Sequence, residues 1–116
     1  MFFKKYVCFF YETVEGKRPV ENFIKSLETT TQDKFLYKKE LLEQFGPSLR
    51  HPNTDSIGNG IFELRFKGPE GKARVLFFFF CKKQIILLHG FVKKTRKTPL
   101  REIKTAKKRM REYLNR

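Results

Sequence analysis

The sequence predicts an α+β fold in which an antiparallel sheet packs against an N-terminal helical hairpin and a C-terminal helix. Apolar residues recur at helical spacing in the first half, strand-like runs with short turns follow, and another helical pattern comes last. The expected order of elements is therefore β-α-α-β-β-β-α. A length of 116 residues is that of one ordinary domain, so we expect residues 1–116 to share one core.

The N-terminal part of the chain predicts one strand and one helix. Residues 6–12 read YVCFFYE, an aromatic run typical of a strand. Pro19 suits the first turn of a helix that follows the turn at Gly16. Apolar residues then recur at i, i+3, i+4 and i+7 and form one stripe: Val20, Phe23, Ile24 and Leu27.

A second helix is expected from near Thr30, where Thr30 and Asp33 resemble a capping pair, to the helix-breaking Gly46-Pro47. It completes a helical hairpin. Its expected inward residues are Phe35, Leu41, Leu42 and Phe45. The segment Ser48–Gly60 is rich in Pro, Asn, Ser, Asp and Gly, so we expect a loop there.

The second half predicts three antiparallel strands, at Ile61–Lys67, Lys72–Cys81 and Gln84–Lys93. Gly68–Gly71 and Lys82-Lys83 are the turns between them. The middle strand is apolar on both faces, which indicates that both sides of the sheet are covered near it.

The last segment predicts a helix with Thr98 as its N-cap and Pro99 in its first turn. Its expected buried stripe is Ile103, Ala106, Met110, Tyr113 and Leu114. Its other face carries cations: Arg101, Lys104, Lys107, Lys108 and Arg111. These are most simply a solvated face, and they can also follow a nucleic-acid backbone or bind a protein partner.

The charge of the chain predicts a polyanionic partner. Lys and Arg number 26 against 12 Asp and Glu, which leaves a net charge of +14. Nucleic acid, an anionic membrane and an acidic protein would each balance such a charge. Aromatic residues make up 16% of the sequence, a fraction that excludes a disordered basic tail.

No pattern in the sequence indicates a membrane span, a metal or a cofactor. The most apolar stretch, residues 75–92, has KKQ at its centre and predicts two strands. Two lysines interrupt the apolar N-terminus and no cleavage site follows, so we expect a cytoplasmic protein. Cys8 and Cys81 are expected to be small apolar residues of a reduced core rather than a disulfide, and no Cys/His spacing suggests zinc.

The first predicted turn sets a register that brings cations together. If that turn is Gly68–Gly71, Lys67 pairs with Lys72 and Arg65 lies opposite Arg74. Favourable side-chain pairs across two strands usually stabilise a sheet by ~0.2–1 kcal/mol each. Two opposed arginines instead repel each other and destabilise it. Such a pair is easier to understand if an anion lies between its members.

The second predicted turn extends this register to the last strand. If Lys82-Lys83 is the whole turn, Cys81 pairs with Gln84, and a row of side chains forms across one face. The predicted row is Arg65, Arg74 and Phe91, with Lys72 and Lys93 as the next pair outward. A slip of one residue in either turn would break the row.

This row describes a pocket for one nucleotide step of single-stranded RNA. Arginine presents a fixed fork of donors to phosphate oxygens, and Phe91 beside it can stack a base. Lys93 and Lys94 can bind phosphate or transfer protons, and Lys67 and Lys72 extend the basic surface.

RNA can be cut without a metal, because its ribose 2′-hydroxyl is an internal nucleophile. General acid–base catalysis then contributes ~10²–10⁴-fold from a group whose pKa is near the working pH. A lysine crowded by other cations moves in that direction. The general base stays open among Lys, His and Glu63, which shares a strand face with Arg65.

Each candidate also has a purely structural interpretation. Arg65 and Arg74 can be exposed strand residues, and Phe91 taken alone would be core. His89 lies among core residues, where a satisfied, partly buried histidine is the commoner case. His51 is most simply a loop residue, although its loop could close over a cleft.

The runs FELRFKGPEGKARVLFF, IILLHGFVKKTRKTP and REIKTAKKRMREY, in this order, resemble the HigB branch of the RelE/ParE toxin superfamily. PVENFIKSL and LLEQFG match that family's helical hairpin, so the resemblance covers essentially the whole chain. It implies a type II toxin that enters the ribosomal A site, cleaves mRNA there and arrests growth. It also implies a cognate helix-turn-helix antitoxin, similar to HigA, and a toxin–antitoxin hetero-oligomer.

The resemblance also implies which residues line the cleft. The matching positions are Arg65, Arg74, Phe91, Lys93 and Lys94. Some relatives use a histidine and a C-terminal tyrosine or carboxylate instead. Gly90 and Phe91 separate His89 from the position of that histidine, and Tyr113 falls on the expected buried face of its helix.

Two other functions stay open. A toxin that poisons DNA gyrase, like the ParE branch, needs no catalytic cations, so alanine at Arg65, Arg74 and Lys93 should leave its toxicity intact. In a non-enzymatic RNA-binding module, the same substitutions should only weaken binding. They would also lower its salt dependence by about one slope unit per lost phosphate contact.

Overall fold

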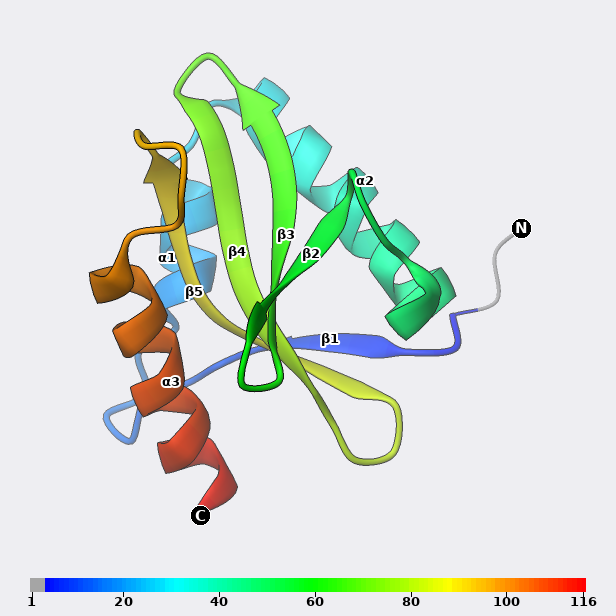
Figure 1. Cartoon of the computed structure of the whole chain (residues 1–116), viewed down its shortest axis with the longest axis vertical. Coiled ribbons are helices and arrows are strands. Elements are labelled where there is room, and N and C mark those ends of the chain that lie inside the picture. Colours follow the sequence, from blue (N-terminus) through cyan, green and yellow to red (C-terminus); the bar gives the residue numbers. More distant parts are fainter. Residues whose placement is uncertain (1–3) are drawn as a thin grey trace.

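The computed structural model describes residues 4–116 and confirms the α+β class and the three α-helices (Figure 1). Its sheet is mixed and has five strands. The helices are α1 (Pro19–Lys25), α2 (Thr29–Phe45) and α3 (Leu100–Leu114), and a short 3-10 turn, η1, spans Gly46–Ser48. The strands are β1 (Val7–Phe10), β2 (Thr54–Gly58), β3 (Ile61–Gly68), β4 (Gly71–Phe80) and β5 (Gln84–Lys93).

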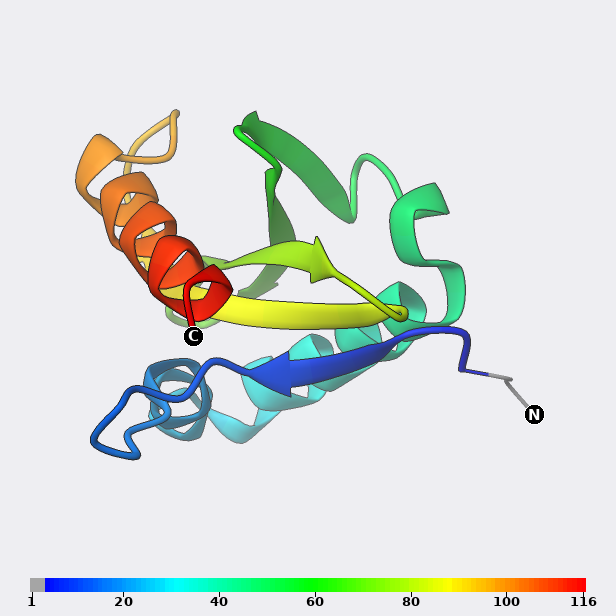
Figure 2. The ribbon, with the colours of Figure 1, turned by 90° about the horizontal axis from the view of Figure 1, so that it is seen from below.

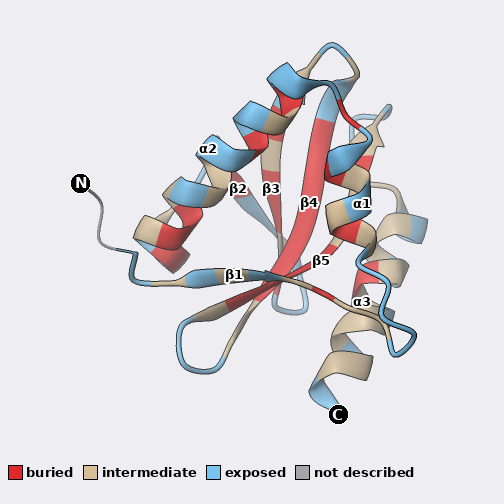
Figure 3. Ribbon diagram, turned by 180° about the vertical axis from the view of Figure 1, so that it is seen from behind, coloured by how far each residue is buried: buried red, intermediate tan, exposed pale blue. Residues whose placement is uncertain are grey.

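Helices cover the two faces of the sheet unequally. In Figure 2, α1 and α2 lie on one side of the sheet and α3 lies on the other. The larger core cluster is between the sheet and the helical hairpin, and it includes Val20, Phe35, Leu42 and Phe77. A smaller cluster joins the other face to α3 through Ala106. The strand β4 is therefore buried along most of its length, as Figure 3 shows.

The strand order in the sheet is β1-β5-β4-β3-β2, and the fold departs from the prediction in two ways. β1 pairs with β5 in parallel, so the fully antiparallel sheet predicted from the sequence is wrong. Turn lengths orient only strands that short turns connect, and a helical hairpin separates β1 from the rest of the sheet. The segment predicted as a loop contains β2, so the order is β-α-α-β-β-β-β-α.

The extra strand β2 is a polar edge strand with the sequence TDSIG. It pairs antiparallel with β3, with Thr54 opposite Leu64 and Asp55 opposite Glu63. Positive φ angles at Gly58, Asn59 and Gly60 form the tight turn between the two strands. Only Thr54 is buried in this strand. Because no alternate residues face a core, the sequence TDSIG shows none of the apolar alternation by which strands are predicted.

The register between β3 and β4 is the predicted one. Arg65 lies opposite Arg74 and Lys67 opposite Lys72. Gly68 and Gly71 also pair, so the connection itself is only Pro69 and Glu70. The close packing of this turn depends on glycine, because a Cβ at Gly68 would collide with the side chain of Thr31.

The register between β4 and β5 contains an irregularity that the sequence did not predict. Phe80, not Cys81, pairs with Gln84, so the turn is one residue longer than expected. A β-bulge follows, because Leu76 pairs with His89 while Phe77 pairs with Leu87, which leaves Leu88 as the extra residue. The bulge compensates for the longer turn, and Arg74 still lies opposite Phe91.

Two predicted helix caps are wrong. α2 begins at Thr29, and no side chain at its N-cap position bonds to its backbone. The carboxylate of Glu70, in the β3–β4 turn, instead accepts bonds from the Glu28 N–H and the Thr31 hydroxyl. Thr98 does not cap α3, whose N-cap position is Pro99.

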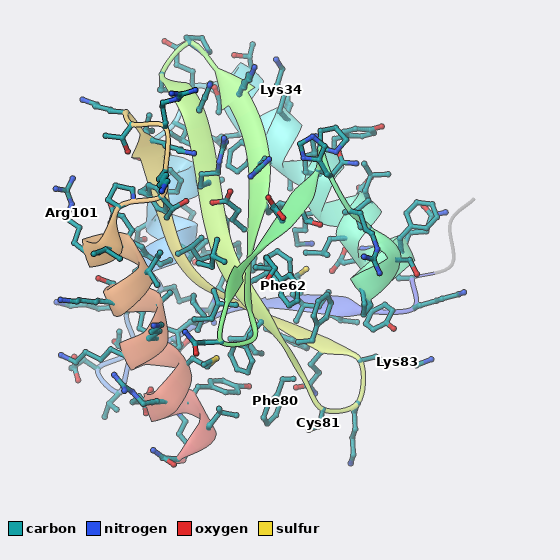
Figure 4. All side chains as sticks on the ribbon, viewed as in Figure 1. Lys34, Phe62, Phe80, Cys81, Lys83 and Arg101 are labelled. Carbon is teal, nitrogen blue, oxygen red and sulfur yellow. The ribbon has the colours of Figure 1, made fainter. Side chains whose placement is uncertain are left out.

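Some predicted core residues lie at the surface. Phe45 and Leu114 are 45% and 52% exposed, and Cys81 is an exposed free cysteine at the tip of the β4–β5 turn (Figure 4). At the end of α2 it is Glu43 that is buried, where it accepts a bond from the backbone N–H of Cys8 at 2.9 Å. Burial and this carboxylate raise the pKa of the Cys8 thiol to about 12. No helix within residues 4–116 is long and apolar enough to cross a membrane.

Candidate functional site

The predicted site residues lie on the α3 side of the sheet, in three rows that run across β3, β4 and β5. The rows are Glu63–Leu76–His89, Arg65–Arg74–Phe91 and Lys67–Lys72–Lys93. α3 covers the first row and reaches Phe91, whereas Lys67 and Lys72 remain exposed. We call Arg65, Arg74, Lys67, Lys72 and Lys93 the cationic face.

Glu63 is the anion between the two opposed arginines. Its carboxylate is buried, with 2% of the residue exposed, and it accepts a bond from Arg65 Nε at 3.0 Å. Arg74 Nε is 3.8 Å from the same oxygen, Oε2. The hydroxyl of Thr98 donates to the other oxygen at 2.7 Å and so connects this pair to the segment that leads into α3. Glu63 therefore holds the arginines in place, and its lone pairs are largely occupied by these donors.

Arg74 is a buried cation with spare hydrogen-bonding capacity. The residue is 6% exposed, and its Nη1 donates to the carbonyl of Ala73 at 2.9 Å. Its Nε is buried and has no hydrogen-bond partner among residues 4–116. Burial lowers the pKa of the guanidinium, Glu63 raises it and Arg65 lowers it further. Glu63 is the only carboxylate among residues 4–116 within ion-pair distance of Arg74, and the Arg74 Nε–H can still donate to an added anion.

Lys93 is a half-buried lysine at the end of β5, two residues outward from Phe91. Burial lowers its pKa, and the nearby charges of Arg74, Arg65 and Lys72 act in the same direction, while Glu63 opposes them. This lysine is therefore closer to proton exchange near neutral pH than an ordinary surface lysine. Lys94 follows the strand and is exposed.

Arg65 has further partners that the sequence did not connect with it. Its Nη2 is 3.1 Å from the exposed carboxylate of Asp55 on β2. Its Nη1 is 3.4 Å from Nδ1 of His51, so the segment predicted as a loop does reach the cationic face. Because β2 was not predicted, no signal in the sequence placed Asp55 there.

The two aromatic rings of the first rows belong to the core under α3. Phe91 is 7% exposed, and its ring stacks on His89 with centroids 5.6 Å apart, so little of it is open to a base. His89 Nε2 is 2.7 Å from Glu102 of α3, and its Nδ1 is 3.2 Å from Arg109. Burial lowers the pKa of His89 more than Glu102 raises it. The structure thus favours the interpretation of His89 as a satisfied, partly buried residue.

Tyr113 is at the opposite end of α3 from these rows. Its ring packs edge-on against Phe78 and Phe80. The geometry therefore does not bring it to the cationic face.

A cavity of about 570 Å³ adjoins the cationic face along β3, and we call it the α2 cavity. Its lining includes Lys34, Tyr37 and Lys38 of α2 together with Arg65, Lys67 and Arg74 of the sheet. The sequence assigned α2 only a packing role, so it did not predict this wall. Within residues 4–116 there is no cluster of three or more His, Cys, Asp or Glu side chains suited to a metal ion.

Fold and surface together define a small, strongly basic α+β domain with arginines and lysines gathered on one face of its sheet. A comparison with protein families matches residues 22–111 to the family described as "Phage derived protein Gp49-like (DUF891)". The match spans about three quarters of the chain, from α1 through most of α3, and the protein belongs to this family. The family is a toxin-like module of the RelE/HigB type. A comparison with curated proteins finds no match.

Proposed function

We propose that this protein is the toxin of a type II toxin–antitoxin pair and a metal-independent endoribonuclease of the HigB kind. Its substrate is mRNA in the ribosomal A site, so it acts in the cytoplasm and stops translation. The observation that carries the proposal is the buried, incompletely bonded Arg74 next to a lysine of lowered pKa. Membership of a toxin-like family supports the same conclusion.

Arg74 and Arg65 bind the scissile phosphate and stabilise the charge that accumulates on its oxygens in the transition state. The ribose 2′-oxygen attacks the adjacent phosphorus, and the bond from phosphorus to the 5′-oxygen breaks. The products are a 2′,3′-cyclic phosphate and a 5′-hydroxyl. The 2′-hydroxyl gives up one proton and the leaving oxygen takes up another. Lys93, at the end of β5 and with a lowered pKa, serves as one proton-transfer group in this scheme, and water exchanges the other proton.

The same proposal includes a cognate helix-turn-helix antitoxin similar to HigA. The net charge of +14 supports an acidic or amphipathic antitoxin segment that neutralises the basic surface. Such binding would form a toxin–antitoxin hetero-oligomer.

Cleavage-site mapping on mRNA in translating ribosomes tests the proposal, with wild type and Arg74→Ala compared. Lys25→Ala is the matched control, because it removes one charge from an exposed position on α1. We expect codon-positioned breaks with wild type and Lys25→Ala, and none with Arg74→Ala. Circular dichroism checks that each variant is folded, and Arg74→Lys replaces the alanine variant if it is not.

Breaks that persist in folded Arg74→Ala would refute the site and keep the function. Growth arrest without any breaks would refute the nuclease and favour a gyrase poison. RNA binding without breaks or growth arrest would favour a non-enzymatic module.

A further inference from the structure

The α2 cavity has the size and position of a second nucleotide site. Its volume of about 570 Å³ lies within the range of ~300–1,000 Å³ that is usual for small-molecule pockets. Arg65 and Arg74 line it and also belong to the cationic face. A nucleic-acid strand bound at these arginines would reach the α2 wall of the cavity by passing β3, whose residues Arg65, Phe66 and Lys67 also line it.

The charge of the cavity is one-sided. Six of its nine lining residues are Lys or Arg, and none is acidic. Within residues 4–116, neither Lys34, Lys67 nor Lys72 forms an ion pair. Figure 4 shows Lys34 projecting beside the upper part of β3. The repulsion between these unpaired lysines opposes folding, and a bound polyanion would reduce it.

Tyr37 provides an open aromatic surface among these cations. It is 61% exposed, whereas Phe91, the aromatic residue predicted to stack a base, is 7% exposed. An exposed tyrosine flanked by lysines suits an unpaired base with its phosphates, because the ring stacks on the base while the cations bind the backbone. A base inside a duplex is already stacked, so the arrangement favours a single strand.

The wall is held in place before any ligand binds. Lys38 Nζ donates to Asn53 Oδ1 at 2.6 Å, and the Asn53 carbonyl accepts from the backbone N–H of Arg65. On the same helix Phe35 packs on Phe66 with ring centroids 5.5 Å apart. Tyr37 thus lies on a helix that is fixed to β3, so binding a ligand requires less ordering of the protein backbone than binding on a flexible loop would.

We propose that Lys34 and Tyr37 form a second subsite for single-stranded RNA, in which Tyr37 stacks the base next to the scissile step and Lys34 binds its phosphate. The proposal rests on the proposed function, since it assumes that the cationic face binds RNA. It names α2 as the element that contacts the strand beyond the cleavage position.

Fluorescence anisotropy with a labelled single-stranded 2′-O-methyl RNA tests this subsite, because that RNA lacks the nucleophile and stays intact. The variants of the full chain are Tyr37→Ala, Tyr37→Phe and Lys34→Gln. Leu36→Ala is the matched control, since Leu36 is the neighbouring residue and is 51% exposed.

We expect Tyr37→Ala to weaken binding about tenfold with an unchanged salt dependence, and Tyr37→Phe to retain the affinity of wild type. Lys34→Gln should lower the slope of log affinity against log salt by about 0.7. Leu36→Ala should bind like wild type.

Affinity that is unchanged in Tyr37→Ala and Lys34→Gln but lost in Arg74→Ala would overturn the subsite and leave the proposed function standing. Codon-positioned cleavage by a protein that binds no free RNA would also overturn the subsite alone. If wild type shows neither binding nor cleavage, both proposals fail. If an acidic peptide binds as tightly as the RNA, and its binding also depends on Lys34 and Tyr37, the cavity would be assigned to a protein partner instead.

Discussion

Replacing Glu63 with glutamine removes the negative charge at the centre of the cationic face and keeps the shape of the side chain. The glutamine amide oxygen can still accept from Thr98, but its NH2 group then faces the Arg65 and Arg74 donors. The change therefore removes both the charge and the hydrogen bond from Arg65. Arg74 would then be a nearly fully buried cation without a neighbouring anion. We expect the free energy of unfolding to fall.

The expected magnitude follows from the burial of the partners. Removing one member of a buried ion pair typically costs about 3–5 kcal/mol. Arg65 is 24% exposed and would keep its ion pair with Asp55, so the loss of its interaction with Glu63 is partly screened by solvent. We therefore expect the free energy of unfolding to fall by an amount near the lower limit, about 3 kcal/mol.

Urea denaturation at neutral pH measures this difference, provided that the denaturant slope is the same in both proteins. The control is Asp55→Asn, which removes a carboxylate that also pairs with Arg65 but is 54% exposed, and it should cost less than about 1 kcal/mol. Arg74→Met added to Glu63→Gln should restore part of the lost stability, because it removes the uncompensated charge. Equal stabilities of Glu63→Gln and Asp55→Asn would refute the reasoning.

Three other predictions concern pH and packing. Lys72→Gln should raise the pKa of Lys93, because it removes a neighbouring cation. The pH profile of RNA cleavage should therefore move to higher pH. An unchanged profile would exclude Lys93 as the titrating group. The pKa of His89 lies below its ordinary value of 6.5, so the unfolded chain takes up more protons at mildly acidic pH. Stability should therefore fall as the pH drops through about 6.5, and in urea titrations His89→Gln should show a smaller fall than wild type. Gly90→Ala should destabilise the fold by about 1–3 kcal/mol, because its Cβ would collide with the Phe23 ring. Phe23→Leu in the same chain should recover part of this loss in thermal unfolding, and additive losses would argue against the collision.

Elements with strong local signals could be predicted from the sequence. The apolar runs and glycine turns of the last three strands set their bounds to within one residue, and the opposed pair Arg65 and Arg74 follows from the Gly68–Gly71 turn. The row that includes Phe91 was also predicted, although the turn length used for it was one residue short. The unpredicted bulge at Leu88 offsets that error.

Features that depend on distant contacts could not be predicted. β2 is polar because it is an edge strand, and its pairing with β3 leaves no periodic pattern in TDSIG. The capping of α2 by Glu70 joins residues about 40 positions apart. Tyr37 reaches the site only because α2 packs along β3, an arrangement that the helical stripe alone does not specify.

The β-bulge has a consequence for how this domain can vary. It separates the tip of the β4–β5 hairpin from the half that carries Arg74, Phe91 and Lys93. Loss of one residue near Cys81 can therefore be absorbed by removing the bulge, because the two changes shift the strand in opposite directions. The hairpin tip can thereby be shortened by one residue while the cationic rows keep their alignment.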